Sequence, residues 1–248
     1  MSGLQLTHAM ILAAGLGTRM RPLTLDVPKP LIPVAGKALI DWNIDWLAAA
    51  GITEVVVNSS YLADKLEAHL AARTAPRIHL SREGAPPLET GGGVKKALPL
   101  LGTQPFLTMN SDAILPLQDS AVHPVRALAA AWDDDVDFLL LVVPRAQAIG
   151  WEGNGDFVVD GAGRTRRPSA DEDAPYIFTG VEIMHPRAFA ESPDGAFSLS
   201  KLWARGQGDA PWLPRVRALV HTGPWLNVGD LQGLAVAERY YGVAATGI

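Results

Sequence analysis

Short apolar runs alternate with helix-like patterns through the first part of the chain. The runs at 9–14, 55–58, 77–80, 105–109 and 138–143 are largely continuous, which is typical of parallel strands buried on both faces. Between them, apolar residues recur every three or four positions at 39–50, 62–72, 91–101 and 122–132, as in amphipathic helices. This order predicts βαβ units and therefore an α/β fold with a doubly wound, mostly parallel sheet.

The pattern changes after Pro144. Turn residues at 153–155 and 160–161, followed by a polar stretch at 164–173, predict hairpins and exposed loops. Further strands are expected at 176–184 and 216–221, and a helix at 231–241. We expect residues 1–248 to form a single domain, in which a part at about 1–145 carries the parallel sheet and a part at about 146–248 adds a small mixed region.

Composition narrows the functional classes. The net charge of −5 argues against a nucleic-acid or anionic-membrane partner, because both need a basic face. The chain has no cysteine, which excludes disulfides and thiolate chemistry. We find neither a secretory signal pattern nor a run of about 18 apolar residues, so a cytoplasmic location is expected.

A loop rich in glycine and arginine follows the first predicted strand. Gly15 and Gly17 allow backbone N–H groups to turn towards phosphate oxygens, and Arg19 and Arg21 add positive charge. A dinucleotide-binding loop would need a third glycine where Met20 stands, and a P-loop would need Gly-Lys-Ser/Thr. The remaining alternatives are a triphosphate-binding loop and an ordinary tight turn.

Lys29 lies between Pro28 and Pro30. The prolines restrict the backbone on both sides, so we expect an extended, stiff loop that presents a preorganised cation. The alternative is a solvated lysine on a proline-rich connection.

Asp112 comes just after a buried strand, at the edge where open α/β sheets bind ligands. A carboxylate there suits Mg²⁺, which takes few protein ligands when phosphate oxygens complete its shell. In isolation, the same aspartate is more typical of a turn or a helix cap.

The segment from Leu12 to Leu23, together with Pro28-Lys29-Pro30-Leu31, resembles the signature of the sugar-phosphate nucleotidyltransferase family. The resemblance implies a Rossmann-like, GT-A-like nucleotidyltransferase fold with Mg²⁺ as cofactor. It implies catalytic roles for Lys29 and Arg19, and it places the nucleotide part at about 1–145 and the sugar-binding part at about 146–248. The loop residues implied to bind the nucleotide are Ala13, Ala14, Gly15, Gly17 and Thr18.

A second metal ligand is implied by the family's late Trp-x-Asp-x-Gly-Thr pattern. Here the pattern reads Trp225-Leu-Asn227-Val-Gly-Asp230, so asparagine replaces the aspartate. The carbonyl of Asn227 can still coordinate Mg²⁺, although without charge. Asp230 is the alternative ligand, and it is equally suited to capping the helix predicted at 231–241.

Two further groups of residues are assigned from the resemblance. Glu83 and Thr90 are expected at the nucleobase, although the glycines that follow Thr90 also fit a helix entry. The residues expected beside the sugar are Glu89, Asn110, Gly155, Thr179 and Gly180.

The resemblance therefore predicts an enzyme that joins an NTP and a sugar 1-phosphate to give a nucleotide sugar and pyrophosphate. In the run Leu88-Glu-Thr-Gly-Gly-Gly93, followed by Lys96-Ala-Leu-Pro-Leu-Leu-Gly102, the chain most resembles the N-acetylmuramic acid 1-phosphate uridylyltransferases of cell-wall recycling, which implies UTP and the muramic sugar. Mannose-1-phosphate guanylyltransferase is one alternative, and a non-catalytic regulatory module that binds a nucleotide sugar is another. The sequence leaves open the base, the sugar and whether the protein is a monomer or a homo-oligomer.

Overall fold

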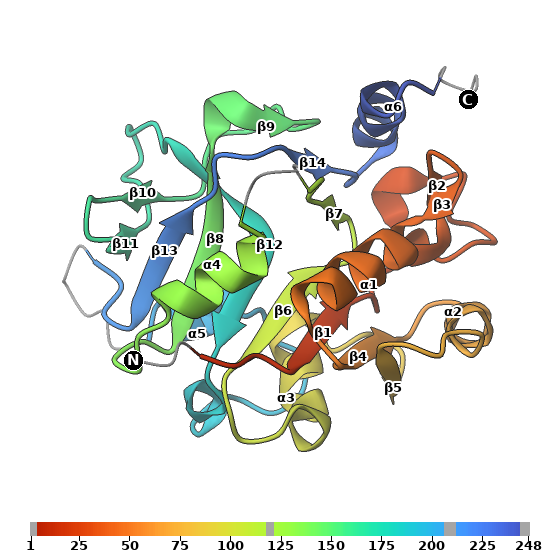
Figure 1. The fold of residues 1–248 in the computed structure, drawn as a ribbon, viewed down its shortest axis with the longest axis horizontal. Helices are drawn as coiled ribbons and strands as arrows, with labels where there is room; N and C mark the ends of the chain where they lie inside the picture. Colours follow the sequence, from red (N-terminus) through yellow and green to blue (C-terminus); the bar gives the residue numbers. More distant parts are fainter. Residues whose placement is uncertain (1–3, 118–121, 206–211, 244–248) are drawn as a thin grey trace.

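A seven-stranded sheet forms the centre of the computed structural model, which describes residues 4–117, 122–205 and 212–243 (Figure 1). The strand order is β13-β8-β12-β6-β1-β4-β5. These strands are β1 (His8–Leu12), β4 (Glu54–Ser59), β5 (Arg77–Arg82), β6 (Phe106–Asn110), β8 (Phe138–Pro144), β12 (Tyr176–Met184) and β13 (Val216–Val220).

Most neighbouring strands run parallel. β1 pairs in parallel with β4 and β6, β4 pairs in parallel with β5, and β8 pairs in parallel with β13. β12 is the exception, because it is antiparallel to both β6 and β8. The prediction of an α/β fold with a mostly parallel sheet is confirmed.

Helices cover both faces of this sheet. Ala9 and Ile11 of β1 point to one face, where α1, α2 and α4 pack, and Met10 points to the other, where α3 and α5 pack. The burial of alternate residues on opposite faces explains why the central strands β1, β6 and β8 are largely apolar, whereas the edge strand β5 is mostly polar. The helices are α1 (Leu39–Ala50), α2 (Ala63–Leu70), α3 (Glu89–Leu101), α4 (Pro124–Ala131) and α5 (Ser200–Trp203).

A smaller layer lies beyond the carboxyl edge of the main sheet. Its three-stranded sheet has the order β7-β14-β9, and α6 packs on it through a separate apolar cluster that includes Met20, Leu226 and Leu234. The short strands are β2 (Pro33–Val34), β3 (Lys37–Ala38), β7 (Ala113–Ile114), β9 (Ala148–Ile149) and β14 (Trp225–Asn227), and α6 spans Leu231–Tyr240. The hairpin of β10 (Val158–Val159) and β11 (Thr165–Arg166) lies in the region where the sequence predicts hairpins.

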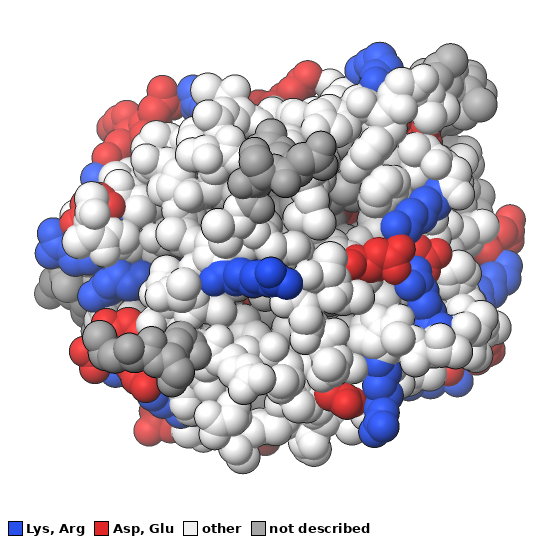
Figure 2. Space-filling model, in the orientation of Figure 1, with Lys and Arg blue, Asp and Glu red and all other residues white. Residues whose placement is uncertain are grey.

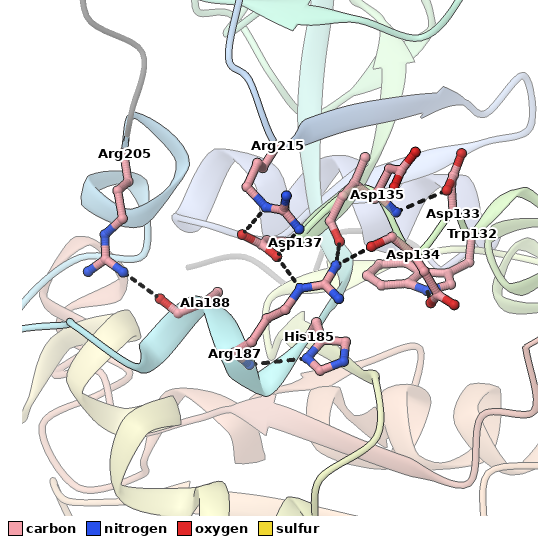
Figure 3. A network of polar contacts seen from close by, with 11 residues as sticks. Trp132, Asp133, Asp134, Asp135, Asp137, His185, Arg187, Ala188, Arg205 and Arg215 are labelled. Carbon is pink, nitrogen blue, oxygen red and sulfur yellow. Dashed lines mark hydrogen bonds and ion pairs between the residues drawn. The ribbon is translucent and has the colours of Figure 1, made fainter.

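An ion-pair network lies at the end of the main sheet opposite its carboxyl edge (Figure 3). Asp137, just before β8, accepts hydrogen bonds from Arg187 Nε at 2.6 Å and from Arg215 Nε at 2.6 Å. Burial alone would raise the pKa of Asp137, but the hydrogen bonds from Arg215 and Arg187 outweigh it and hold that pKa below its usual value. This network joins the start of β8, the end of β12 and the start of β13. It therefore holds these strands together on the side of the sheet away from the carboxyl edge.

Charged side chains are dispersed over the face drawn in Figure 2, where small groups of both signs lie mainly towards the two sides and a basic side chain lies near the middle. No helix within the described ranges is both long and apolar enough to cross a membrane.

Candidate active site

A cavity of about 390 Å³ lies at the carboxyl edge of β1, β4 and β6. Most of the residues expected from the sequence to bind substrate meet there, although they come from segments far apart in the chain. They are Ala13, Ala14, Gly15, Gly17, Thr18, Arg19, Lys29, Glu89, Thr90, Asn110 and Asp112.

The glycine-arginine loop turns sharply out of β1 and packs against the lysine segment. Gly17 has a φ of +63°, and a Cβ atom there would lie 3.1 Å from Lys29 Cβ and 3.1 Å from Thr24 Cγ2. The Thr24 hydroxyl donates to the Gly17 carbonyl at 2.7 Å. Gly17 is therefore required both for its left-handed backbone and for this close approach. The following turn, Thr18–Met20, is anchored by the buried side chain of Met20.

Lys29 begins a short 3₁₀ turn, Lys29–Leu31, rather than lying in the extended loop that the two prolines predict. Pro28 is extended, as its φ of −65° and ψ of 141° show, but Pro30 is compatible with the first turn of a helix. The Lys29 ammonium group donates to Asp112 Oδ2 at 2.6 Å and to the Gly229 carbonyl at 3.2 Å. Only 12% of the lysine side chain and 22% of the aspartate side chain are exposed. Lys29 is thus held in place and is not a freely solvated surface lysine.

Strand pairing brings Asn227 beside Asp112. Asn227 in β14 is opposite Ala113 in β7, and the Val228 N–H donates to the Asp112 carbonyl at 2.8 Å. The described residues include no cluster of three or more His, Cys, Asp or Glu side chains suited to a metal. A carboxylate and an amide carbonyl are nevertheless hard oxygen donors that suit Mg²⁺ when phosphate oxygens supply further ligands.

Arg19 and Asn227 approach each other across Gly229. A Cβ atom on Gly229 would lie 3.2 Å from Asn227 Oδ1 and 3.3 Å from Arg19 Nη2. Asn227 does not line the main cavity but a neighbouring one of about 260 Å³, which Arg19 and Asp230 also line. Asp230 caps α6, since its Oδ1 accepts a hydrogen bond from the Gly233 N–H at 2.9 Å. The helix-cap interpretation of Asp230 therefore has direct structural support.

Glu83 lies behind the cavity and not in its lining, in contrast to the expectation that it contacts the nucleobase. Both of its carboxylate oxygens are used: Oε1 accepts from Asn58 Nδ2 and Oε2 from the Leu88 N–H, each at 2.7 Å. Asn58 does line the cavity and was missed by the sequence analysis. Its position at the carboxyl end of β4 is the signal that could have identified it.

The entry to α3 is built by close packing. Cβ atoms on Gly91 and Gly92 would lie 2.3 Å from the Phe197 ring and 2.2 Å from the Gly195 carbonyl, so these glycines pack against protein and do not approach a base. The Thr90 hydroxyl accepts from the Leu199 N–H at 2.9 Å. Glu89, with a φ of +57°, starts the helix and lines the cavity.

Three residues expected beside the sugar lie outside the cavity lining. The buried Thr179 hydroxyl donates to the Leu141 carbonyl at 2.8 Å, and a Cβ atom on Gly155 would lie 2.0 Å from the Ala174 carbonyl. Gly180, with a φ of +82°, leaves room for Asn110, because a Cβ atom there would lie 2.7 Å from Asn110 Nδ2. Gly180 thereby supports the wall that Asn110 presents to the cavity.

Comparison with known proteins identifies the family of the chain. Residues 8–151 match the nucleotidyl transferase family. The chain is 46% identical to N-acetylmuramate alpha-1-phosphate uridylyltransferase of Caulobacter vibrioides, over 93% of this chain and 95% of that protein. It is 38% identical to the protein of the same name in Neisseria meningitidis serogroup B, over 94% and 98% of the two chains.

Other relatives are more distant. Mannose-1-phosphate guanyltransferase beta-B of Xenopus laevis is 41% identical, but over only 45% of this chain and 32% of that protein. Among solved structures, HddC from Yersinia pseudotuberculosis complexed with GMP-PN superposes with a TM-score of 0.74 at 20% identity, covering 95% of this chain and 100% of that one. That likeness supports the fold.

Proposed function

The chain belongs to the sugar-1-phosphate nucleotidyltransferases of the nucleotidyl transferase family, and from this we propose that it transfers the uridylyl group of UTP to N-acetylmuramic acid 1-phosphate. The products are the UDP-sugar and pyrophosphate. The observation that carries the choice of substrates is the identity of 46% across 95% of a uridylyltransferase of that specificity. The mannose-specific relative matches over only 32% of its length, which disfavours GTP and mannose 1-phosphate.

The reaction is an in-line displacement at the α-phosphorus of UTP. An oxygen of the sugar 1-phosphate forms a bond to this phosphorus, while the bond to the oxygen that bridges to the β-phosphate breaks and pyrophosphate leaves with its electron pair. A sugar phosphate is already ionised near neutral pH, so no general base is required. Catalysis then rests on positioning the reactants and neutralising their charge.

The residues that line the cavity suit this task. The loop from Ala14 to Thr18 offers backbone N–H groups to the triphosphate, as nests of such groups do for other anions, whereas the Ala13 N–H already donates to Asn58 Oδ1. Arg19 stabilises the departing pyrophosphate, and Lys29 donates to the α-phosphate and to the incoming sugar phosphate. Residues 1–145 supply nearly all of this lining and hold the nucleotide, whereas residues 146–248 contribute Gly229 to it and, through Gly180, support Asn110 on the sugar side.

Asp112 and Asn227 would hold Mg²⁺, which when bound offsets negative charge on the α-phosphate. The Lys29 ammonium group donates to Asp112 Oδ2 at 2.6 Å, which shows that this carboxylate oxygen accepts a cationic partner. Asp230 is the less favoured ligand because its Oδ1 already caps α6.

Pyrophosphate release tests the proposal. UTP, GTP, dTTP and CTP are each mixed with Mg²⁺ and the 1-phosphates of N-acetylmuramic acid, N-acetylglucosamine, glucose and mannose, with Lys29→Ala as the matched inactive control. Turnover confined to UTP and the muramic sugar is expected. Turnover of GTP with mannose 1-phosphate would overturn the choice of substrates.

A non-catalytic module that binds a nucleotide sugar is the second candidate, and the uncharged Asn227 at a metal-ligand position favours it. Against it, Arg19, Lys29 and Asp112 line one cavity, an arrangement that binding alone does not require. A folded wild type that releases no pyrophosphate with any substrate pair would support the non-catalytic module.

A further inference from the structure

A buried chain of hydrogen bonds joins three segments behind the cavity. Ala13 N–H donates to Asn58 Oδ1 at 2.6 Å, Asn58 Nδ2 donates to Glu83 Oε1 at 2.7 Å, and Leu88 N–H donates to Glu83 Oε2 at 2.7 Å. Asn58 is 2% exposed and Glu83 is 6% exposed. We refer to Ala13, Asn58, Glu83 and Leu88 as the relay.

The two ends of the relay fix its polarity. Ala13 and Leu88 contribute backbone N–H groups, which can only donate. Asn58 must therefore present its oxygen to Ala13 and its amide nitrogen to Glu83. Glu83 in turn faces two donors, and only a carboxylate accepts at both of its oxygens. Glutamine at position 83 would bring its own donor against either Asn58 or Leu88.

The packing leaves the relay little room to rearrange. A Cβ atom on Gly93 of α3 would lie 2.7 Å from Glu83 Oε1 and 2.9 Å from Asn58 Nδ2. The helix backbone thus lies directly against the two side chains. A mismatch of donors is expected to be relieved by movement of Ala13 or Leu88 and not by rotation of the side chains.

Ala13 and Leu88, the two ends of the relay, belong to or adjoin segments that line the cavity. Ala13 begins the glycine-arginine loop, and Leu88 directly precedes Glu89 and Thr90, which line the same cavity. We infer that Asn58 and Glu83 are positioning residues for the nucleotide, an inference that rests on the proposed function. They fix the distance between the phosphate loop and the start of α3. Glu83 acts through Asn58 and Leu88 without itself contacting the substrate.

Exchanging the side-chain amide of Asn58 and the carboxylate of Glu83 tests this inference. Glu83→Gln leaves two donors facing each other, and Asn58→Asp places two carboxylates in contact. The double variant Asn58→Asp/Glu83→Gln satisfies every partner again. Its new carboxylate at position 58 accepts from the Ala13 N–H and from the new side-chain amide at position 83, whose oxygen accepts from the Leu88 N–H.

The dissociation constant of UTP is measured by titration calorimetry with Mg²⁺ and without sugar phosphate, so that it does not depend on turnover. Each single variant should bind UTP about tenfold or more weakly, since an unsatisfied buried donor or a like-charge contact is costly. The double variant should return to within about threefold of the wild type. The KM for the sugar phosphate should change much less than the affinity for UTP.

Glu182→Gln is the matched control, because Glu182 is also buried but does not line the cavity, and its affinity for UTP should equal that of the wild type. Wild-type affinity in Glu83→Gln, or a double variant no better than the single ones, would overturn the inference. So would equal losses for UTP and the sugar phosphate, which indicate a general loss of structure. If a single variant does not fold, the double variant decides, since the inference requires it to fold and bind UTP.

The wild type separates this inference from the proposed function. UTP binding without turnover would refute the proposed transfer reaction and leave the relay to be judged by the variants. Turnover without rescue in the double variant would refute the relay alone.

Discussion

Replacing Glu182 by glutamine should stabilise the protein at alkaline pH and change its stability much less at acidic pH. Glu182 lies in β12 between Thr108 of β6 and Leu140 of β8, and it is 1% exposed. Burial raises the pKa of this carboxyl from 4.5 to about 8, although the hydrogen bond from Trp203 Nε1 at 3.1 Å favours the charged form and opposes the shift. The folded protein therefore holds a neutral acid inside the sheet at neutral pH.

The sign and size of the effect follow from proton linkage. Above pH 4.5 the unfolded chain loses this proton, whereas the folded chain keeps it until about pH 8. The unfolded state then binds fewer protons, so the free energy of unfolding falls as pH rises through this window. At about 1.4 kcal/mol per pKa unit, the loss between pH 5 and pH 8 is on the order of 3 to 4 kcal/mol. Glutamine has no such proton and should avoid the loss.

Urea unfolding of the wild type and Glu182→Gln at pH 5, 6.5 and 8 measures this difference. Comparing the two proteins at the same pH cancels contributions from other titrating groups. The stability of the variant relative to the wild type should rise steadily with pH. Glu191→Gln, which changes an exposed glutamate, is the control and should show little dependence. A difference between Glu182→Gln and the wild type that stays constant from pH 5 to pH 8 would refute the reasoning.

Three further predictions concern Lys29 in the main cavity and Asn227 and Asp230 in the neighbouring one. Lys29→Ala should lower kcat about 100-fold or more in a folded protein, because a preorganised charge is lost, and nearly normal turnover would contradict its catalytic role. Asn227→Ala should raise the Mg²⁺ concentration needed for half-maximal rate and Asn227→Asp should lower it, so an unchanged metal dependence would remove Asn227 from the site. Asp230→Ala should cost about 1 kcal/mol in urea unfolding by removing the α6 cap, with unaltered Mg²⁺ dependence. A shifted Mg²⁺ dependence would instead identify Asp230 as the ligand.

Local sequence patterns were sufficient for the main sheet and for much of the cavity. Continuous apolar runs identified central strands such as β1, β6 and β8, because burial on both faces leaves no polar alternation. Lys29 and Asp112 are 83 positions apart, and each was a candidate from its own surroundings, one from flanking prolines and the other from its place after a strand. The family resemblance was needed to favour a site role over a solvated lysine and a turn or helix cap. Open α/β sheets bind ligands at the carboxyl edge, so residues that follow different strands are expected to meet there.

The same patterns could not show which polar side chains face the ligand and which support the wall behind it. Glu83 and Thr179 occur in recognisable segments, but each is buried with hydrogen-bond partners from other parts of the chain. Asn58 has no distinctive local motif, and its importance becomes visible only when Ala13 and Glu83 are seen on either side of it. Burial of a polar group requires partners, and those partners are set by the tertiary fold.

Backbone contacts fix the position of Asn227, and no local sequence motif reveals them. Its strand has three residues, and a shift of one residue in pairing with β7 would turn the side chain to the other face. The hydrogen bond from Val228 N–H to the Asp112 carbonyl opposes such a shift. Cβ atoms on Gly233 and Gly150 would lie 2.2 Å and 3.0 Å from the Asn227 carbonyl, so the backbone is enclosed there. Because this backbone holds position 227 beside Asp112, we expect Asn227→Asp to alter the charge at the proposed metal position while keeping the geometry.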